Sequence, residues 1–158
     1  MTVNKIAADL VSVLKEKNLH IAFAESCTGG MAAAELTSVP GASEVFELGV
    51  VSYSERIKNK VIYVKKTTLE RYSVYSAETA QEMALGVLKL SDADIAAAVT
   101  GLAGPGGGTA QKPVGTVYIA VTDNNRTFLK EYHFQGDREE IRKQTVTEIF
   151  KCILNFCQ

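Results

Sequence analysis

Two reactive side chains stand next to each other in a turn of small and polar residues. Ser26 and Cys27 follow an apolar run at residues 20–24 and precede the alanine-rich segment 31–36. This pattern predicts a strand, a tight turn and a helix, with the Ser26 hydroxyl exposed beside the backbone N–H groups of Cys27 and Thr28. Such a turn suits a nucleophile and the oxyanion that forms on attack. Because serine is also a preferred helix cap, capping is the alternative role of Ser26.

A serine nucleophile needs a general base, and neither histidine suits that role. His20 begins the strand that precedes Ser26, roughly 13–17 Å away at the usual rise per residue. His133 lies on an exposed-looking hairpin strand. The remaining candidate is a lysine in the polar segment 53–60, which follows another predicted strand and so lies at the same sheet edge. Burial or nearby positive charge must bring its pKa from about 10.4 toward about 7–8. A solvated charged turn is the alternative.

Cys27 is the competing nucleophile, because a thiol at a helix N-terminus has a lowered pKa. No histidine is expected beside it, and a hydroxyl precedes it directly in the sequence. A small buried side chain is therefore the favoured interpretation of Cys27.

A second candidate binding element is the glycine-rich segment 101–108, which follows the apolar strand predicted at residues 94–100. Ligands of open α/β sheets bind outside the carboxyl ends of the strands, and glycines let backbone N–H groups approach a ligand closely. The segment lacks the Gly-Lys-Ser/Thr ending of a phosphate-binding Walker loop. A flexible surface loop is the alternative.

The composition is that of one globular domain, residues 1–158, because 46% of the residues are hydrophobic and 22% are charged. A formal net charge of −1 gives no electrostatic case for nucleic acid or an anionic membrane as a partner. No apolar run reaches the length of about 18 residues that a membrane span needs. The chain has three cysteines, an odd number, so we expect no disulfide framework and a reducing cytoplasm. Its two histidines lie far apart in sequence and no cluster has the spacing of a zinc site, so we expect no metal.

The elements that must position these segments follow from hydrophobic periodicity and cap residues. The expected helices lie at residues 3–17, 31–36, 67–71 and 77–90 and after Asp137, with Thr2, Ser76 and an Asp137–Glu140 capping box as caps. The expected strands lie at residues 20–24, 45–53, 94–100, 114–122 and 126–134, and residues 54–60 open a helix or turn. The order is helix, strand, helix, strand, two helices, three strands and a helix. It predicts an α/β fold, one three-layer α/β/α domain with a mixed, mostly parallel sheet.

Five segments, taken in order, resemble the motifs of one family. They are AESCTGG (residues 24–30), GVVSYSERIK (residues 49–58), VTGLAGPGG (residues 99–107), KPVGTV (residues 112–117) and GDR followed by Arg142 (residues 136–142). In these segments the chain is similar to the CinA C-terminal domain family, whose characterised activity is nicotinamide-nucleotide amidohydrolase. The resemblance extends over nearly the whole chain.

The resemblance implies hydrolysis of the carboxamide of nicotinamide mononucleotide to nicotinate mononucleotide and ammonia, in pyridine-nucleotide salvage. It implies a Ser26–Lys58 pair, for which we expect a mechanism through an acyl-enzyme. Tyr53 is expected to orient Lys58 or to line the pocket, and packing of the strand is its alternative role. It also implies an anticodon-binding-domain-like sheet and neither a metal nor an organic cofactor. The residues expected to bind the substrate are Glu25, Cys27, Thr28, Gly29, Gly30, Thr100, Gly101, Ala103, Gly104, Gly106 and Arg142, and Arg138 is the alternative to Arg142 for the phosphate.

The expected partners are this small nucleotide and further copies of the chain, because small α/β enzymes often self-associate. Neither nucleic acid nor a membrane is expected. The alternative function is a catalytically silent nucleotide-binding or regulatory module of the same fold.

The chain departs from the family motifs in three places. Glu55 stands where the family usually has asparagine, and a carboxylate three residues before Lys58 would raise the lysine pKa if it pointed inward. Residues 62–64 read Ile-Tyr-Val in place of Leu-Gly-Val, and residues 73–76 read Ser-Val-Tyr-Ser in place of Gly-Ala-Val-Ser.

Overall fold

A five-stranded mixed sheet forms the centre of the computed structural model, which describes residues 2–158. The strands lie in the order β2-β1-β3-β4-β5. Strand β1 (Ile21–Glu25) pairs in parallel with β2 (Phe46–Val51) and β3 (Ile95–Gly101), whereas β4 (Thr116–Thr122) and β5 (Thr127–His133) join by antiparallel pairing. Four strands therefore point the same way and only β4 runs against them, which confirms the mixed, mostly parallel sheet.

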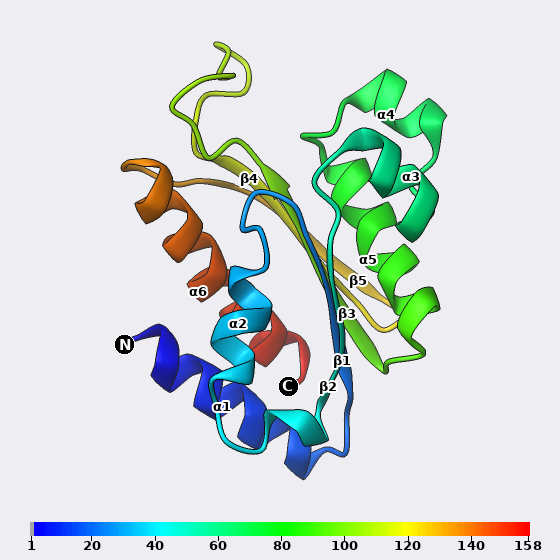
Figure 1. The fold of residues 1–158 in the computed structure, drawn as a ribbon, viewed down its shortest axis with the longest axis vertical. Helices are drawn as coiled ribbons and strands as arrows, with labels where there is room; N and C mark the ends of the chain where they lie inside the picture. Colours follow the sequence, from blue (N-terminus) through cyan, green and yellow to red (C-terminus); the bar gives the residue numbers. More distant parts are fainter. Residues whose placement is uncertain (1) are drawn as a thin grey trace.

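Helices cover both faces of the sheet, as Figure 1 shows. One face carries α1 (Val3–Glu16), α2 (Met31–Thr37) and α6 (Arg138–Phe156), and a short 3-10 turn, η1 (Ala42–Glu44), precedes β2. The other face carries α3 (Glu55–Ile62), α4 (Lys66–Tyr72) and α5 (Ala77–Ser91). The three-layer arrangement expected from the sequence is confirmed.

The strands in the middle of the sheet are buried along their whole length. Every residue of β1, β3 and β4 is buried, because helices pack on both sides of these strands. Small residues let the layers approach closely. A Cβ atom at Gly86 of α5 would lie 1.7 Å from the Ile62 carbonyl oxygen, so only glycine allows α5 to contact the end of α3.

The predicted helix caps are confirmed. The side chains of Thr2 and Ser76 accept hydrogen bonds from backbone N–H groups in the first turns of α1 and α5. Asp137 and Glu140 form the full capping box at the start of α6. Residues 54–60 form a helix rather than a turn, because the Ser54 hydroxyl accepts a hydrogen bond from the Ile57 N–H and caps α3. Three helices therefore lie between β2 and β3, where the sequence pattern counted two.

Two motif departures fall at backbone positions that favour glycine. Tyr63, which follows α3, has φ of 62°, and Ser73, which follows α4, has φ of 70°. The family usually has glycine at both positions. The backbone therefore keeps the glycine-like conformation although the side chains have changed.

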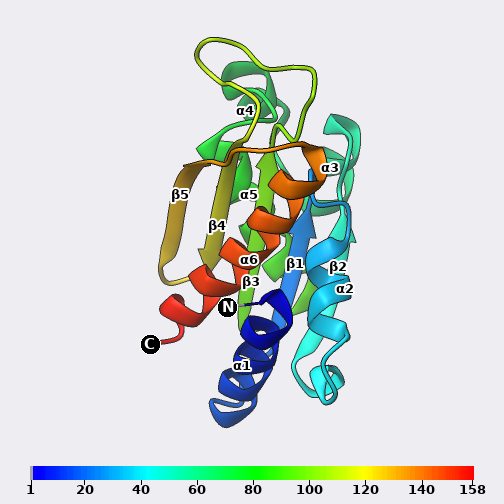
Figure 2. The same ribbon diagram turned by 90° about the vertical axis from the view of Figure 1, so that its left-hand side faces the viewer.

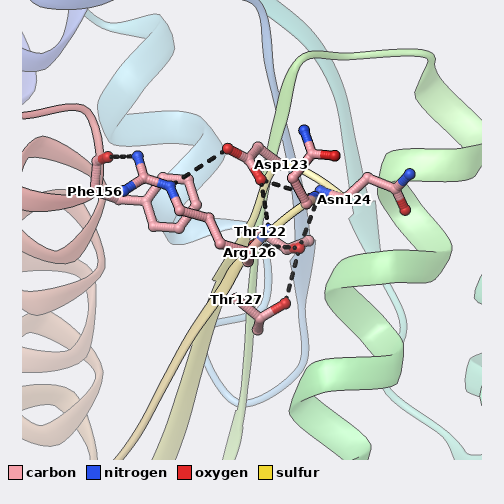
Figure 3. A network of polar contacts seen from close by, with 7 residues as sticks. Thr122, Asp123, Asn124, Arg126, Thr127 and Phe156 are labelled. Atoms are coloured by element: carbon pink, nitrogen blue, oxygen red, sulfur yellow. Dashed lines mark hydrogen bonds and ion pairs between the residues drawn. The ribbon is translucent and has the colours of Figure 1, made fainter.

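A polar network ties the β4–β5 hairpin to the C-terminal end of α6, as Figure 3 shows. The Asp123 carboxylate accepts the backbone N–H groups of Asn125 and Arg126 at 3.0 and 2.9 Å. The Arg126 guanidinium donates to the Phe156 carbonyl at 2.5 Å and lies 4.2 Å from the centroid of its ring. A cation at a helix C-terminus is favourable. This network fixes the end of the sheet opposite the candidate site.

The carboxyl ends of β1, β2 and β3 gather at the other end of the sheet. The loop between β3 and β4 and the N-terminus of α6 lie at the same end, at the top of Figure 2. This is the position where ligands bind in open α/β sheets. None of the helices within residues 2–158 combines the length and the apolar character needed to cross a bilayer.

Candidate active site

Ser26 lies at the end of β1, one residue before the turn that leads to α2. Its backbone N–H donates to the Val99 carbonyl at 3.1 Å, which extends the β1–β3 pairing by one residue. The helix itself begins only after Gly30, which has φ of 97°. Ser26 is therefore not the cap of α2, and its hydroxyl is available for another role.

Glu25 caps α2 in place of Ser26. Its side chain is buried, with 2% of its surface exposed. The carboxylate accepts hydrogen bonds from the Thr28 hydroxyl at 2.5 Å and from the backbone N–H groups of Gly30, Ala32 and Ala33 at 2.9–3.2 Å. Four donors satisfy this buried carboxylate, and the negative charge lies at the positive end of the helix. Glu25 therefore fixes the shape of the turn.

Lys58 reaches Ser26 from α3 on the other face of the sheet. It is 1% exposed, and its Nζ donates to the Ser26 Oγ at 2.9 Å and to the Ser52 carbonyl at 2.6 Å. The Ser52 N–H in turn donates to the Glu25 carbonyl at 2.9 Å. A single buried amine is thus held between the ends of β1 and β2.

Burial decides the protonation of Lys58. Removal from water disfavours its charged form and lowers the pKa from 10.5 to about 8. The Glu55 carboxylate acts in the opposite direction and raises the pKa of Lys58, but Glu55 is exposed and the effect of burial is larger. At pH 7 a group with this pKa is neutral in about one molecule in ten. Lys58 can therefore accept a proton near neutral pH.

Cys27 is not a thiolate at neutral pH. Burial raises the pKa of its thiol from 9.0 to about 12, and only 6% of the residue is exposed. The lowered pKa that a helix N-terminus would give is absent, because desolvation is the larger effect. The favoured interpretation of Cys27 as a small buried side chain is confirmed.

A pocket of about 360 Å³ opens above the Ser26–Lys58 pair. This volume lies in the range of small-ligand sites. The predicted residues that line it are Ser26, Cys27, Tyr53, Lys58, Gly101, Ala103, Gly104 and Gly106, and they are joined by Ser54, Glu55, Val74, Tyr75, Leu102 and Arg138. The structure thus brings together three strand ends, the α4–α5 connection and the first turn of α6.

Arg138 spans the mouth of this pocket. Its guanidinium donates to the Gly104 carbonyl at 2.7 Å and to the Tyr53 hydroxyl at 3.0 Å. Tyr53 is 61% exposed, so its ring belongs to the rim and not to the packing of the sheet. Of the described residues, Lys58 and Arg138 are the cationic side chains that line the pocket.

Six of the predicted substrate-binding residues do not line the pocket. They are Glu25, Thr28, Gly29, Gly30, Thr100 and Arg142. The Arg142 guanidinium donates to the carbonyls of Cys27 and Thr28 at 3.1 and 2.9 Å, so it holds the turn from behind. The Thr100 hydroxyl donates to the Val74 carbonyl at 2.7 Å. Arg142 and Thr100 thus support the segments on either side of the pocket, and the contact of these six residues with a substrate stays a prediction.

Val74, Tyr75 and Ser54 line the pocket although no sequence pattern placed them there, and Arg138 was expected only as the alternative to Arg142. The sequence position of Arg138 could have pointed to a functional role. It lies in the first turn of α6, where the helix dipole disfavours a cation. Nothing in the local sequence places Val74 and Tyr75 at the site. Their position depends on the hydrogen bond between Val74 and Thr100, which lie 26 residues apart in sequence.

The turn also offers donors for an oxyanion. Within residues 2–158, the backbone N–H groups of Cys27 and Thr28 donate to no other residue. Unpaired N–H groups beside a nucleophile stabilise the negative oxygen of a tetrahedral intermediate. A hydroxyl, a buried amine and free N–H donors together can perform acyl transfer. The same described residues contain no group of three or more His, Cys, Asp or Glu side chains that could hold a metal ion.

Residues 3–157 match the family model of the CinA C-terminal domain. A protein of Thermoanaerobacter sp. (strain X514), provisionally named a competence-damage inducible protein, is 49% identical over 137 residues, 87% of this chain and 33% of the relative. A CinA-like protein of Endomicrobium trichonymphae is 51% identical over 134 residues, 85% of this chain and 31% of the relative. The chain spans about a third of the length of the curated relatives it matches.

Solved structures match the chain over its whole fold. The competence/damage inducible protein CihA of Agrobacterium tumefaciens is 37% identical, with a TM-score of 0.96 over 99% of this chain and 96% of that protein. A CinA superfamily protein of Klebsiella pneumoniae 700603 is 32% identical, with a TM-score of 0.96 over 99% of this chain and 98% of that protein. These similarities agree with the three-layer fold.

Proposed function

The chain belongs to the CinA C-terminal domain family, and we propose that it hydrolyses the carboxamide of nicotinamide mononucleotide to nicotinate mononucleotide and ammonia. The observation that carries the proposal is the 2.9 Å contact between the buried Lys58 Nζ and the Ser26 Oγ. A nucleophile and a base at this distance are the essential parts of a serine amidohydrolase. The motif resemblance supplies the substrate.

The first half of the reaction transfers the acyl group to Ser26. Neutral Lys58 accepts the Ser26 proton while the Oγ attacks the carboxamide carbon. The N–H groups of Cys27 and Thr28 stabilise the oxyanion of the tetrahedral intermediate. Protonated Lys58 then donates its proton to the departing nitrogen, and ammonia leaves.

The second half releases the product. A water molecule loses a proton to Lys58 and attacks the ester carbon of the acyl-enzyme. The tetrahedral intermediate collapses, and the proton returns from Lys58 to the departing Ser26 Oγ. The carboxylic acid that forms loses its remaining proton to solvent and leaves as nicotinate mononucleotide. The buried thiol of Cys27 takes no part, because burial keeps its pKa at about 12.

We expect the rate to rise with pH through the pKa of Lys58. Only the neutral amine accepts a proton, so kcat/KM should increase about tenfold per unit below pH 8 and level off above it. Glu55→Gln should move the midpoint to lower pH, because the Glu55 carboxylate raises the Lys58 pKa. Initial rates of ammonia release between pH 6 and pH 9 measure both effects. A profile that falls over this range, or a Glu55→Gln midpoint at higher pH, would contradict Lys58 as the base.

Arg138 is the proposed partner of the substrate phosphate, because its guanidinium lies at the pocket mouth and suits bidentate contact with phosphate. Arg138→Gln should raise KM for nicotinamide mononucleotide about 10- to 100-fold, because a hydrogen bond to a charged group typically contributes a binding free energy of that size. The phosphate-free riboside should show an unchanged kcat/KM with the variant. Lys143→Gln, at an exposed cation of the same helix, is the matched control. Equal losses with nucleotide and riboside would mean that Arg138 acts only through Gly104 and Tyr53.

The test of the proposed function is direct. The purified chain is incubated with nicotinamide mononucleotide, and ammonia and nicotinate mononucleotide are measured in parallel. Equal amounts of both products support the amidohydrolase. Binding of the nucleotide without any ammonia would instead favour the silent binding module.

A further inference from the structure

The connection between α4 and α5 supplies one wall of the pocket, through Val74 and Tyr75. We propose that Tyr75 is a specificity-determining residue whose aromatic ring selects a positively charged aromatic ring in the substrate over an uncharged one. The inference rests on the proposed function, since the substrate of that reaction carries its carboxamide on a pyridinium ring.

The order of the strands places Tyr75 and Tyr53 on opposite sides of the nucleophile. Ser26 directly follows β1, which lies between β2 and β3, and Tyr53 follows β2 on one side of it. Tyr75 belongs to a segment that is hydrogen-bonded to Thr100 of β3, on the other side of β1. A flat ring whose carboxamide reaches Ser26 therefore enters between the two segments that carry these tyrosines.

The wall is fixed before any ligand arrives. The Thr100 hydroxyl donates to the Val74 carbonyl at 2.7 Å, and the Lys112 ammonium donates to the Tyr75 carbonyl. The Tyr75 N–H donates to the Ser73 hydroxyl at 3.2 Å. Hydrogen bonds from β3, from the β3–β4 loop and from the end of α4 thus hold the backbone on both sides of the Tyr75 side chain.

The backbone conformation of Ser73 shows that the surrounding hydrogen bonds hold this segment in an unfavourable conformation. Its φ of 70° and ψ of 170° lie in a region that is essentially restricted to glycine. The conformation is retained because the Ser73 carbonyl accepts the hydroxyls of Ser76 and Thr79 at 3.0 and 2.8 Å. Strain of this kind persists where the surrounding structure over-determines the backbone, and it concentrates at ligand sites. The Tyr75 wall is therefore preorganised.

The charges of the pocket explain why an aromatic wall is needed. Lys58 is mostly protonated at pH 7 and Arg138 is always charged, whereas Glu55 is the carboxylate that lines the pocket. Net charge therefore does not attract a cationic ring to this site. The negative face of a tyrosine ring does, because its quadrupole attracts a cation within about 6 Å.

The inference is tested by binding in the Ser26→Ala background, where turnover is absent. Calorimetry measures the affinity for nicotinamide mononucleotide and for its reduced form, which has the same carboxamide, ribose and phosphate but an uncharged ring. We expect about a 3- to 30-fold preference for the oxidised form. Tyr75→Phe should keep this preference, because the ring remains. Tyr75→Val, the residue usual in the family, should abolish it while leaving the affinity for the reduced form unchanged.

The controls separate the possible causes. Phe128→Leu removes an exposed aromatic ring from β5, far from the site, and should keep the preference. The unaltered affinity of Tyr75→Val for the reduced form shows that the variant is folded. The inference is overturned if the wild-type site shows no preference, if Tyr75→Val weakens both ligands equally, or if neither ligand binds.

The outcome is independent of catalysis. Ammonia release by the unmodified chain without any ring preference would support the proposed amidohydrolase and overturn the role of Tyr75. A Tyr75-dependent preference without ammonia release would support the role of Tyr75 and overturn the proposed amidohydrolase.

Discussion

Replacing Ser26 by alanine should lower the rate of ammonia release from nicotinamide mononucleotide by about five to six orders of magnitude, as in serine hydrolases that lose their nucleophile. The Ser26 Oγ is the atom that Lys58 deprotonates, and no neighbour can replace it. The adjacent Cys27 thiol stays protonated, since burial raises its pKa to about 12. Ammonia release is measured with the variant at high concentration and with the wild-type chain diluted until both rates fall within the range of the assay.

Two further variants make this result specific. Cys27→Ala should retain activity within about tenfold, because the thiol contributes packing but no bond making. Arg142→Gln, behind the turn, should lower activity through displaced carbonyls of Cys27 and Thr28 without removing the nucleophile. If Ser26→Ala keeps more than a hundredth of the wild-type rate while Cys27→Ala loses it, the nucleophile is Cys27 or water.

The fold was predictable because its signals are local. The amphipathic period of α1 and α5, the caps at Thr2 and Ser76, and the capping box at Asp137 lie within a few residues of the elements they define. The charged sequence of α3 has few apolar residues, so its pattern does not distinguish a helix from a turn. Its stability comes from Ser54 at its start and from Ile62, which is buried by the rest of the chain.

The site was predictable only as a set of segments. The resemblance to the CinA C-terminal domain family implied the pair Ser26 and Lys58, and the structure brings them to 2.9 Å. Sequence does not tell which residues of a motif face the pocket and which support it. Arg138 and Arg142 lie one turn apart on α6, yet the first reaches Tyr53 and the second reaches the carbonyls behind Ser26. That difference depends on the docking angle of α6, which is set by long-range packing.

Cys27 shows a second limit of local reasoning. A thiol near a helix N-terminus is expected to have a lowered pKa, whereas burial raises it here. The same desolvation acts on Lys58 with the opposite result, because it disfavours a positive charge on the amine. One buried environment therefore keeps the thiol neutral and makes the lysine a base.

Lys58→Met should lower activity by about two to four orders of magnitude, the usual contribution of a general base. Methionine nearly matches the length of the lysine stem, so the packing of α3 is retained while the base is lost. Ammonia release at pH 8 measures the effect. Activity within about tenfold of wild type would show that Ser26 is deprotonated by another group.

The same substitution should reveal the energetic cost of the buried amine. In the unfolded chain Lys58 titrates near 10.5, and in the folded chain near 8, so below pH 8 the folded state holds a protonated lysine that burial disfavours. The pKa gap corresponds to about 3 kcal/mol. Between pH 8 and 10.5 the unfolded state binds more protons, so the unfolding free energy of the wild-type chain should rise with pH by about that amount. Lys58→Met should lack this rise, so its stability relative to wild type should fall by about 3 kcal/mol from pH 7 to pH 11.

Urea unfolding at the two pH values measures the difference, and a constant difference would mean that Lys58 is not held in its uncharged form by the fold. The loss of activity together with this change would identify one buried nitrogen as the source of both catalysis and instability.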